Sequence, residues 1–330
     1  MIKVIKPGLH TTVQDLGRYG FQQLGISPSG AMDDYAHRLV NILVGNRENA
    51  ATLEMTLTGA KLLFKTDSLI AIGGAQTQVF INDRKVSMWR PIYIKAGSVL
   101  SIGIAEFGCR MYLAVSGGIA VTSILKSSST YLRGNLGGYK GRALQSDDEI
   151  LIGEKSLIGA RYCKRENATL QMDWCVSESM LLHYKKPFIQ LIEGKEFYLM
   201  SKDSKRKLFK DEFRISPNSD RMGYRLNGNK LSLHSKKELL SEGVSLGTIQ
   251  LPSDGNPIVL MADRQTTGGY AKIAYIASVD LSIMAQKKPG DSIQFKKIAL
   301  EEAQKEWIER ELYLRILTKG VLQKLMEEKE

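Results

Sequence analysis

Short apolar runs alternate with glycine-rich and polar turns through residues 51–119. Runs of this kind, rich in β-branched residues and bounded by turn signals, predict closely spaced β-strands. The predicted strands cover residues 61–64, 68–72, 78–81, 91–94, 99–104 and 110–115. The predicted turns fall at Gly73-Gly74, Asn82-Asp83, Ala96-Gly97 and Gly117-Gly118. This density of strands is typical of a β-barrel or a β-sandwich.

A helical period is visible in two places. One helix is predicted to begin at Asp33 and to stop at Gly45, and its apolar face comprises Ala36, Leu39, Val40, Leu43 and Val44. His37 lies in this helix and is expected at the surface, without a catalytic role. From Ile298 onward the pattern predicts a C-terminal helix with a break near Gly320. Its apolar stripe is expected to pack on its own domain and comprises Trp307, Leu312, Ile316, Leu317, Val321 and Leu325.

Several features of the first half of the chain recur 188 or 189 residues later. The repeated pairs are Ile26-Ser27-Pro28 with Ile215-Ser216-Pro217, Glu54 with Glu242, and Gln76-Thr77 with Gln265-Thr266. We therefore expect a duplicated β-lobe in which the loops at Gln76 and Gln265 occupy equivalent places, and in which the two glutamates share a structural role. The expected organisation is a first β-lobe over residues 1–153, a connector over 154–184, a second β-lobe over 185–297 and a helical segment over 298–330.

Composition narrows the classes of function. The 330 residues are 43% hydrophobic and 25% charged, and no apolar run is long enough to cross a bilayer, so no membrane association is expected. The N-terminus lacks the apolar core of a signal peptide, which predicts a cytoplasmic location. The net charge of +11 comes mostly from scattered lysines without a nucleic-acid-binding motif. A solvated surface is the favoured explanation, with an anionic substrate second and no nucleic-acid partner.

Histidine and cysteine spacing gives no sign of a metal site. His10, His37, His183 and His234 are not at metal-ligand spacing, and Cys109, Cys163 and Cys175 form no CxxC pair. We therefore expect neither a protein-bound metal nor a Ser-His-Asp triad.

Two polar loops interrupt the strand pattern. Residues 263–270 lie between the strand-like runs 257–262 and 271–279. They contain charged side chains, hydrogen-bond donors and acceptors, and two glycines. A recognition loop held by rigid strands and a hairpin turn that caps its own backbone both fit this pattern. The segment from Gly8 to Arg18 is also too polar for a core element and is expected to be a second recognition loop.

With these motifs, the chain resembles the KipA family, also called the allophanate hydrolase subunit 2 or carboxyltransferase A/B family. The resemblance covers nearly the whole chain and is carried by residues 12–18, 29–33, 46 with 53–54, 112–118, 128–131, 137–138, 219–226, 247–250, 263–270 and 289–291. It implies a mainly β fold with some α, in which two cyclophilin-like β-barrel lobes are related by the internal repeat and followed by a C-terminal helix.

Bacterial members of this family include the C component of 5-oxoprolinase, so the resemblance implies one part of an ATP-dependent lactam hydrolase. The complex would open 5-oxo-L-proline to L-glutamate, with ATP as co-substrate, only when the chain joins two partners, one KipI-like and the other LamB/YcsF-like. The chain has no Met-Lys-Met biotinylation site, so covalently bound biotin is not expected. Two alternatives stay open: a non-enzymatic regulator that binds a KipI-like histidine-kinase inhibitor, and a carboxyltransferase subunit that uses a separate biotin carrier.

Such chemistry develops negative charge on oxygen, which fixed hydrogen-bond donors stabilise. Arg264 and Arg18 are the expected holders of a carboxylate or phosphate, because a guanidinium binds both oxygens of such a group. Asp263, Gln265 and Asp15 complete the expected catalytic set. The alternative is that each arginine forms an ion pair with the aspartate near it in sequence.

The expected substrate-binding residues are drawn from the same motifs and comprise Thr266, Thr267, Gly268, Gly269, Tyr270, Gln14 and Gln250. A glycine-rich loop with two cations could cradle the anionic co-substrate, and its expected contacts are Gly137, Gly138, Lys140 and Arg142.

Overall fold

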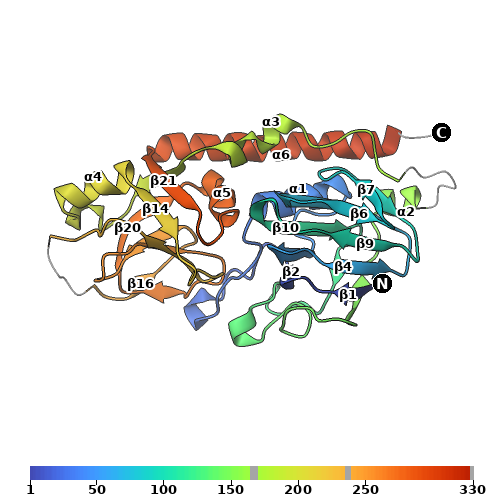
Figure 1. Cartoon of the computed structure of the whole chain (residues 1–330), viewed down its shortest axis with the longest axis horizontal. Helices are drawn as coiled ribbons and strands as arrows, with labels where there is room; N and C mark the ends of the chain where they lie inside the picture. Colours follow the sequence, from blue (N-terminus) through green and yellow to red (C-terminus); the bar gives the residue numbers. More distant parts are fainter. Residues whose placement is uncertain (164–169, 235–238, 328–330) are drawn as a thin grey trace. The chain divides into compact units, whose positions relative to one another are not determined.

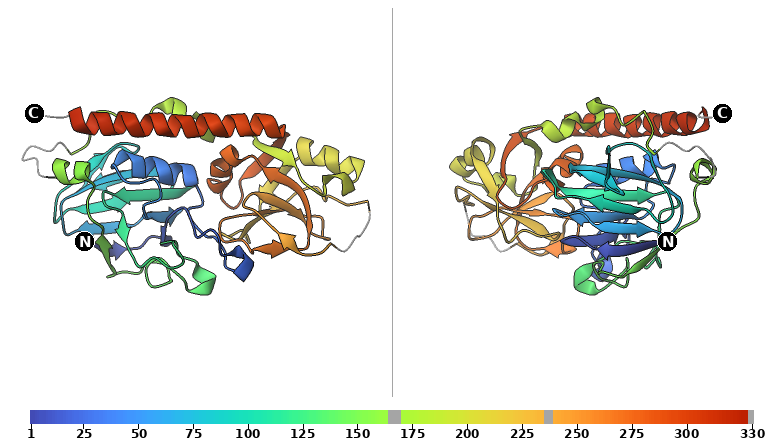
Figure 2. Two further views of the ribbon diagram at one scale, coloured as in Figure 1. Left: turned by 180° about the vertical axis from the view of Figure 1, so that it is seen from behind. Right: turned by 45° about the vertical axis from the view of Figure 1, so that its right-hand side comes forward.

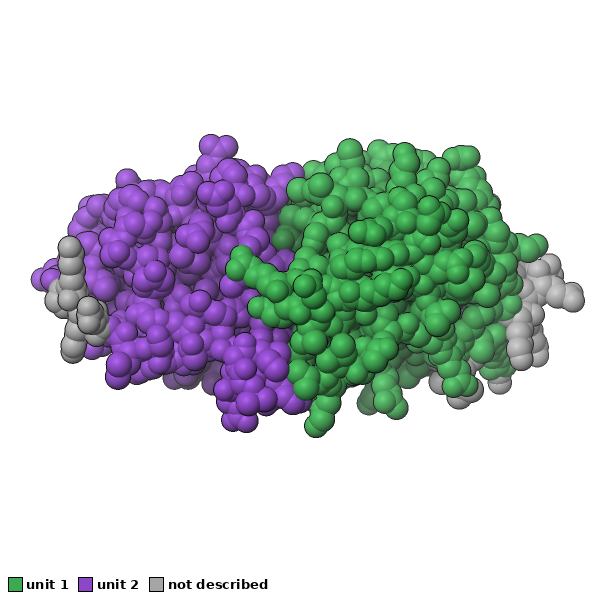
Figure 3. All heavy atoms as spheres, turned by 90° about the horizontal axis from the view of Figure 1, so that it is seen from below, with its two compact units in different colours: residues 1–18, 33–180, 312–330 green, residues 19–32, 181–311 purple. Residues whose placement is uncertain are grey.

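The computed structural model describes residues 1–163, 170–234 and 239–327 (Figure 1). The chain divides into two compact units, each made of segments that are separate in sequence (Figure 3). Unit 1 contains residues 1–18, 33–180 and 312–330, and unit 2 contains residues 19–32 and 181–311. No helix in the described part of the chain is long and apolar enough to span a membrane.

Unit 1 is built from two β-sheets. Among its described residues, one sheet has the strand order β11-β12-β1-β4-β9-β6-β7 and the other has the order β2-β3-β10-β5-β8. The strands are β1 (Ile2–Lys6), β2 (His10–Gln14), β3 (Thr52–Thr56), β4 (Lys61–Phe64), β5 (Ser68–Gln76), β6 (Val79–Ile81), β7 (Arg84–Val86), β8 (Ile92–Ile94), β9 (Val99–Ile102), β10 (Phe107–Val115), β11 (Ile119–Ala120) and β12 (Glu149–Ile152). The helices are α1 (Asp34–Leu43), α2 (Leu157–Tyr162) and α3 (Glu178–Leu181), of which α3 ends at the sequence boundary with unit 2; the short 3₁₀ turn is Leu132–Gly134.

The two sheets of unit 1 share one apolar core. Ile2 and Leu62 from the first sheet and Leu53, Ile70 and Met111 from the second are fully buried in the same cluster. This is the packing of a β-sandwich, in which alternate residues of each strand face the partner sheet.

Unit 2 closes into a barrel with the strand order β13-β20-β17-β18-β15-β14-β21. Its strands are β13 (Ile189–Glu193), β14 (Glu212–Ile215), β15 (Gly223–Asn227), β16 (Glu242–Gly243), β17 (Thr248–Leu251), β18 (Ile258–Leu260), β19 (Thr267–Gly268), β20 (Ala271–Ile276) and β21 (Ser292–Lys297). The short strands β16 and β19 pair with each other outside the barrel. The helices are α4 (Lys202–Lys210), α5 (Leu281–Ala285) and the first part of α6 (Leu300–Glu327), and the 3₁₀ turns are Gln22–Leu24, Leu182–Lys185, Phe197–Leu199 and Ser278–Asp280.

An N-terminal segment, residues 19–32, belongs to unit 2 although most of the unit follows residue 180. Met32 is 2% exposed and lies in the barrel core with Leu191 and Ile249. The aromatic rings of Phe213 and Phe295 pack in the same core with centroids 5.7 Å apart. The sequence did not predict this insertion, because nothing local marks which core a lone methionine will join.

The expected mainly β fold with two β-lobes and a C-terminal helix is confirmed. The expected turn at Gly73-Gly74 is wrong, because both glycines lie within β5. A Cβ at Gly74 would lie 2.1 Å from the carbonyl oxygen of Arg110 on β10, so glycine serves here for close strand approach and not for a turn.

The expected surface position of His37 is also wrong, since this side chain is fully buried. Helix α1 has its N-cap at Asp33, whose side chain accepts a hydrogen bond from Ala36 N–H at 2.9 Å, and it packs against β5 and β10. Most of its residues are buried, so the face that would carry His37 to solvent is covered.

The expected break in the C-terminal helix is absent from its described residues. Helix α6 runs unbroken through Gly320, as Figure 2 shows. One glycine in a helix costs about 1 kcal/mol, which a long helix tolerates. Its predicted apolar stripe is only partly buried: Val321 is 2% exposed, whereas Trp307, Leu312 and Ile316 are 45%, 55% and 56% exposed. The side chain of Leu325 lies outside the described residues.

Candidate functional site

Asp15 is the centre of a polar cluster in unit 1. Its Oδ1 atom accepts hydrogen bonds from the Ser127 hydroxyl at 2.7 Å, from the Gly17 N–H at 2.8 Å and from the Ser129 hydroxyl. Its Oδ2 atom accepts one from the Ser128 N–H at 2.6 Å. Both carboxylate oxygens of Asp15 therefore accept hydrogen bonds, and these bonds connect residues 15–17 to residues 127–129 within unit 1.

Gln14 and Arg18, on either side of this carboxylate, are fully buried. Gln14 donates from Nε2 to Thr12 Oγ1 at 3.0 Å and to the carbonyl oxygen of Thr130 at 3.2 Å. Its Oε1 atom is buried without a hydrogen-bond partner among the described residues. Arg18 donates from Nη2 to the carbonyl oxygen of Ser129. Both side chains therefore bind the backbone of residues 129–130.

The glycines expected to bind the co-substrate pack against the same segment. Gly137 has φ +69°, and a Cβ there would lie 2.2 Å from the carbonyl oxygen of Ser129. Glycine is therefore required at position 137, both because the φ angle is positive and because a side chain would clash with Ser129. The Gly138 N–H donates to the carbonyl oxygen of Ser128 at 3.1 Å and is engaged within the unit.

The two cations of this loop differ. Arg142 binds both oxygens of Asp148 at 2.7 Å, and these hydrogen bonds raise the pKa of Arg142 and lower the pKa of Asp148. Lys140 lies 5.2 Å from the ring centroid of Tyr139 and has no carboxylate within 4 Å among the described residues. Of the expected co-substrate contacts, Lys140 is thus the one whose charge remains available to a ligand.

In unit 2, Asp263 pairs with Arg221 and not with its neighbour Arg264. Arg221 donates from Nε to Asp263 Oδ2 at 2.9 Å and from Nη2 to Oδ1 at 3.0 Å. The Ser29 hydroxyl donates to the same Oδ1 at 2.7 Å, and Arg221 also reaches the carbonyl oxygen of Gly30 at 2.6 Å. The pair is buried, so it fixes the 29–30 segment against the start of the 263–270 loop.

Arg264 is a buried guanidinium with no carboxylate partner among the described residues. Its side chain is 5% exposed, and it donates to the carbonyl oxygens of Val244 at 3.5 Å and Met261 at 3.4 Å, both long for such bonds. Burial lowers the pKa of Arg264, although the nearby Tyr19 and Asp263 act in the opposite direction. A cation held in this way is poorly compensated, so an anion or a polarised carbonyl oxygen beside it would be stabilised.

Gln250, Gln265 and Gly268 lie together on the outside of the barrel. A Cβ at Gly268 would lie 2.3 Å from Gln250 Nε2 and 3.1 Å from Gln265 Nε2. Gln250 is 2% exposed, and its Nε2 atom is buried without a hydrogen-bond partner among the described residues. Its neighbours Ile249 and Leu251 lie in the barrel core, so Gln250 faces the opposite way.

Lys272 stands directly across from Gln250 on β20, so both side chains project from the same face. Lys272 is 4% exposed, and its Nζ lies 3.7 Å from a carboxylate oxygen of Glu196 and 3.6 Å from one of Glu242. Glu242 lies on β16, opposite Gly268 on β19. We refer to Gln250, Gln265, Gly268, Lys272, Glu196 and Glu242 as the outer-face cluster.

The rest of the expected recognition loop lies beside residues 239–244. The carbonyl oxygen of Thr266 accepts a hydrogen bond from Val244 N–H at 3.1 Å, and Thr267 is exposed on β19. A Cβ at Gly269 would lie 3.3 Å from the carbonyl oxygen of Leu239, and Tyr270 is 49% exposed. The loop is therefore a short edge strand with a polar rim and not a tight hairpin turn.

The sequence interpretation missed Lys272, Glu196 and Arg221. The sequence offers a signal for Lys272, because it is the one charged residue in the otherwise mostly apolar run 271–278. Nothing in the sequence around Glu196 marks it as a site residue. The repeat-equivalent glutamates also differ in environment: Glu54 is 1% exposed and accepts a hydrogen bond from the Tyr112 hydroxyl at 2.7 Å, whereas the Glu242 side chain is 45% exposed.

Comparison with known proteins decides the family. The model of the carboxyltransferase domain, subdomain A and B, matches residues 24–297. The chain belongs to this carboxyltransferase family.

Named relatives of this carboxyltransferase-family chain fall in two groups. It is 40% identical to the 5-oxoprolinase C subunit of Escherichia coli K12 over 92% of the chain and 94% of that protein. It is 35% identical to the 5-oxoprolinase C subunit of Haemophilus influenzae over 95% of the chain and 96% of that protein. The solved Kluyveromyces lactis urea amidolyase matches 96% of the chain with a TM-score of 0.85 and 30% identity, but the chain spans only 20% of that enzyme.

Within this carboxyltransferase fold, unit 2 offers the better electrophilic site. Arg264 supplies a poorly compensated positive charge, Gln250 supplies a buried amide donor, and Lys272 supplies a second cation close to two carboxylates. Arg264 can polarise a carbonyl group, and Gln250 and Lys272 of the outer-face cluster can bind a small amide or carboxylate.

Proposed function

We propose that the chain is the C component of an ATP-dependent 5-oxoprolinase, which opens 5-oxo-L-proline to L-glutamate only together with a KipI-like partner and a LamB/YcsF-like partner. The observation that carries the proposal is the end-to-end match to the 5-oxoprolinase C subunit of E. coli, at 40% identity over 94% of that protein. The match to urea amidolyase involves only a fifth of a much longer chain. ATP is the proposed co-substrate of the complex.

The proposed role of unit 2 follows from the chemistry of a lactam. Opening the ring breaks the C–N bond of a planar amide, and the attack on its carbonyl carbon moves negative charge onto the carbonyl oxygen. Arg264 is the proposed stabiliser of that charge, because a guanidinium in a poorly solvated site interacts more strongly with an oxyanion than it does in water. Gln250, Gln265 and Lys272 are the proposed contacts for the amide and carboxylate of the substrate.

The test is reconstitution of the chain with its KipI-like and LamB/YcsF-like partners and measurement of 5-oxoproline-dependent ADP release. We expect Arg264→Ala to lower kcat by at least about 100-fold, as expected for loss of one oxyanion donor. Arg206→Ala is the matched control, since Arg206 is an exposed arginine of the same unit that pairs with Asp203. Wild-type turnover in the Arg264 variant would remove Arg264 from the site, and no ADP release from the wild-type complex would reject the function.

Carboxyl transfer from a separate biotin carrier is the second candidate, because the fold matches that of urea amidolyase with a TM-score of 0.85. The same preparation distinguishes the two: carboxyl transfer would require added carboxybiotin carrier, whereas 5-oxoproline hydrolysis would proceed without it.

A further inference from the structure

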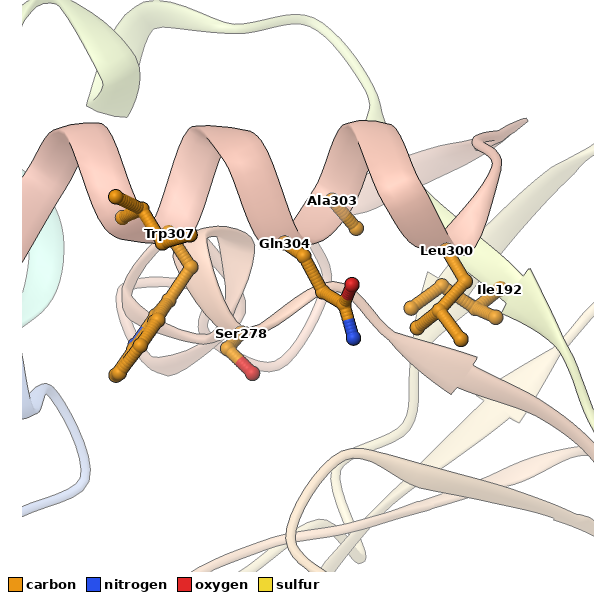
Figure 4. Close-up of a pocket in the computed structure, with 7 residues that line it drawn as sticks. Ile192, Ser278, Leu300, Ala303, Gln304 and Trp307 are labelled. Carbon is orange, nitrogen blue, oxygen red and sulfur yellow. The ribbon is translucent and has the colours of Figure 1, made fainter.

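The two polar side chains at the centre of the outer-face cluster are shielded from solvent. Gln250 is 2% exposed and Lys272 is 4% exposed, although both project from the outside of the barrel. Unit 2 also has an open groove of about 500 Å³ beside α6, where Trp307 is 45% exposed (Figure 4), but this groove shares no residue with the cluster. A ligand of the cluster therefore has to uncover Gln250 and Lys272 before it can bind them.

The short strands β16 and β19 cover this part of the barrel. They form a separate two-stranded sheet, in which Glu242 stands opposite Gly268. Gly268 packs directly against Gln250, because a Cβ at position 268 would lie 2.3 Å from Gln250 Nε2. A carboxylate oxygen of Glu242 lies 3.6 Å from Lys272 Nζ. Thus β19 lies against the amide of the cluster, and β16 reaches its ammonium group.

The contacts of β16 are weak. Residues 240–243 are exposed, Leu240 is 87% exposed, and a Cβ at Gly243 would meet no atom within 4 Å. The carboxylate of Glu242 accepts hydrogen bonds from Lys195 Nζ at 2.8 Å and 3.0 Å, but an ion pair between two exposed side chains contributes little stability. A segment with few buried contacts and exposed backbone hydrogen bonds opens at a small cost in free energy.

The two carboxylates beside Lys272 are held in different ways. The Glu196 side chain is 7% exposed and accepts a hydrogen bond from the Lys272 N–H at 3.0 Å, and the Glu196 N–H donates to the carbonyl oxygen of Lys272 at 3.2 Å. Glu196 is therefore fixed to β20. The Glu242 side chain is 45% exposed and reaches Lys272 from β16. Glu242 is thus the carboxylate that leaves Lys272 when β16 moves.

The charges of this site indicate what replaces Glu242. The ion pairs around Lys272 join two cations, Lys195 and Lys272, with two carboxylates, Glu196 and Glu242. Removal of Glu242 leaves one positive charge in excess, which a ligand with one carboxylate neutralises. Gln250 Nε2 is buried without a hydrogen-bond partner among the described residues, so it also requires an acceptor.

We propose that β16 and β19 form a lid over a carboxylate-binding subsite at Lys272, and that Glu242 occupies this subsite until the carboxylate of the substrate displaces it. The proposal rests on the function proposed above, in which the substrate is 5-oxo-L-proline. One oxygen of its carboxylate binds Lys272 Nζ, and the other accepts a hydrogen bond from Gln250 Nε2. Glu242 keeps its hydrogen bonds with Lys195, and the closed lid excludes water from the bound lactam. A neutral amide without a carboxylate does not displace Glu242, so the subsite selects among amides.

The accessibility of Lys272 measures the state of the lid. An amine-acetylating reagent is added to the reconstituted complex without ATP, and mass spectrometry follows Lys272, with the exposed Lys202 as the internal reference. We expect 5-oxo-L-proline at about ten times its Kd to slow acetylation of Lys272 by about tenfold. The same lactam without its carboxylate, 2-pyrrolidinone, should give no protection. Without ligand, Glu242→Gln should speed acetylation of Lys272 by about two- to fivefold, the factor that corresponds to an exposed ion pair.

Steady-state kinetics distinguish a competing carboxylate from a structural one. In Glu242→Gln the substrate carboxylate has no charged competitor at Lys272, so KM for 5-oxo-L-proline should fall by about two- to fivefold, and by more than kcat changes. A glutamate that only holds the fold would raise KM or lower kcat when it is replaced. Glu149→Gln is the matched control, because the Glu149 side chain is 48% exposed and pairs with Lys65 in unit 1.

The outcomes separate the lid from the function on which it rests. Unchanged acetylation of Lys272 and unchanged KM in the Glu242 variant, with an active wild-type complex, overturn the role of Glu242 and leave the function intact. Equal protection of Lys272 by 5-oxo-L-proline and 2-pyrrolidinone, or protection by neither in an active complex, overturns the carboxylate subsite. A wild-type complex that releases no ADP with 5-oxo-L-proline overturns the function, and with it the ligand of the subsite.

Discussion

The loops that contain Asp15 and Asp263 each have an arginine shortly after the aspartate in sequence, and they differ in the groups that bind the buried carboxylate. Asp15 receives hydrogen bonds from the Ser127 and Ser129 hydroxyls and from backbone N–H groups. Asp263 receives a bidentate arginine, Arg221, which comes from a different loop of the same unit. One carboxylate is solvated by its own unit's hydroxyls and backbone, and the other is neutralised by a buried cation.

This difference has a consequence for the arginine that follows Asp263. Because Arg221 satisfies that carboxylate, Arg264 is left buried with only long hydrogen bonds to carbonyl oxygens. Asp263 is next to Arg264 in the sequence, but it does not neutralise Arg264 in the folded structure. The partner that decides the role of Arg264 lies 43 positions before it, at Arg221.

Removal of the Asp263 carboxylate should have the largest effect on the stability of unit 2. We expect Asp263→Ala to lower the free energy of unfolding of unit 2 by about 3–5 kcal/mol, because the buried Arg221 would lose the carboxylate that it binds through both oxygens. Urea denaturation of the chain, followed by a signal from unit 2, measures the loss.

A double variant separates the cost of a stranded charge from the value of the pair. In Asp263→Leu with Arg221→Met, both charges are replaced by apolar groups, so the loss should be clearly smaller than for Asp263→Ala. Equal or additive losses would show that the buried pair itself supplies the stability. Lys195→Ala is the control for an exposed ion pair, that with Glu242, and should leave unfolding unchanged.

Much of the fold could be predicted from local patterns. Strand periodicity, the helix beginning at Asp33 and the long C-terminal helix depend on residues close in sequence, and the structure contains all of them. The failures involve packing between distant segments. The sequence pattern predicts a turn at Gly73 and Gly74 because glycine permits turns, but the close approach of β10 is what requires glycine at position 74. The pattern of α1 predicts His37 at the surface, because nothing in the sequence of this helix reveals that most of its residues are buried.

The candidate site could be predicted only in part for the same reason. The sequence shows that residues 263–270 are rich in polar groups and that Gln250 is polar. The structure brings Gln250, Gln265 and Gly268 together. The partners Lys272 and Glu196 were missed because a barrel register decides which strand residue stands opposite Gln250. Register over such distances is set by the whole sheet and has no local signature.

The buried polar residues of unit 1 include a histidine, His37, which should make the stability of this unit depend on pH. Burial lowers the pKa of His37 from 6.5 to about 4, against the opposing effect of Asp15 and Glu54. As the pH falls below 6.5, His37 takes up a proton in the unfolded chain, whereas His37 in folded unit 1 stays neutral down to about pH 4. Stability should therefore fall with pH across this window, by up to about 1.4 kcal/mol per pH unit.

The histidine variant isolates this effect from the carboxylates that titrate nearby. His37→Gln retains a hydrogen-bonding group near the Thr52 hydroxyl, which lies 2.9 Å from His37 Nδ1, and removes the titration. Denaturation measured between pH 4 and 6.5 should then show a flatter dependence than the wild type. His234→Gln, at an exposed site, should leave the wild-type slope in place. An unchanged slope in the His37 variant would mean that this histidine takes up its proton as readily in folded unit 1 as in the unfolded chain.

The smallest expected effect tests whether Asp15 is an anchor or a reacting group. Asp15→Asn keeps the shape but loses the charge, and its amide N–H₂ would face the Ser128 N–H or the serine hydroxyls that now donate to it. Loss of charge-assisted hydrogen bonds of this kind costs about 1.5–3 kcal/mol of unfolding free energy. If Asp15 only ties residues 15–17 to residues 127–129, kcat of the reconstituted complex should change far less than in the Arg264 variant. A kcat lowered by about 100-fold or more, with unfolding unchanged, would instead place Asp15 among the reacting groups and remove the contrast between the two loops.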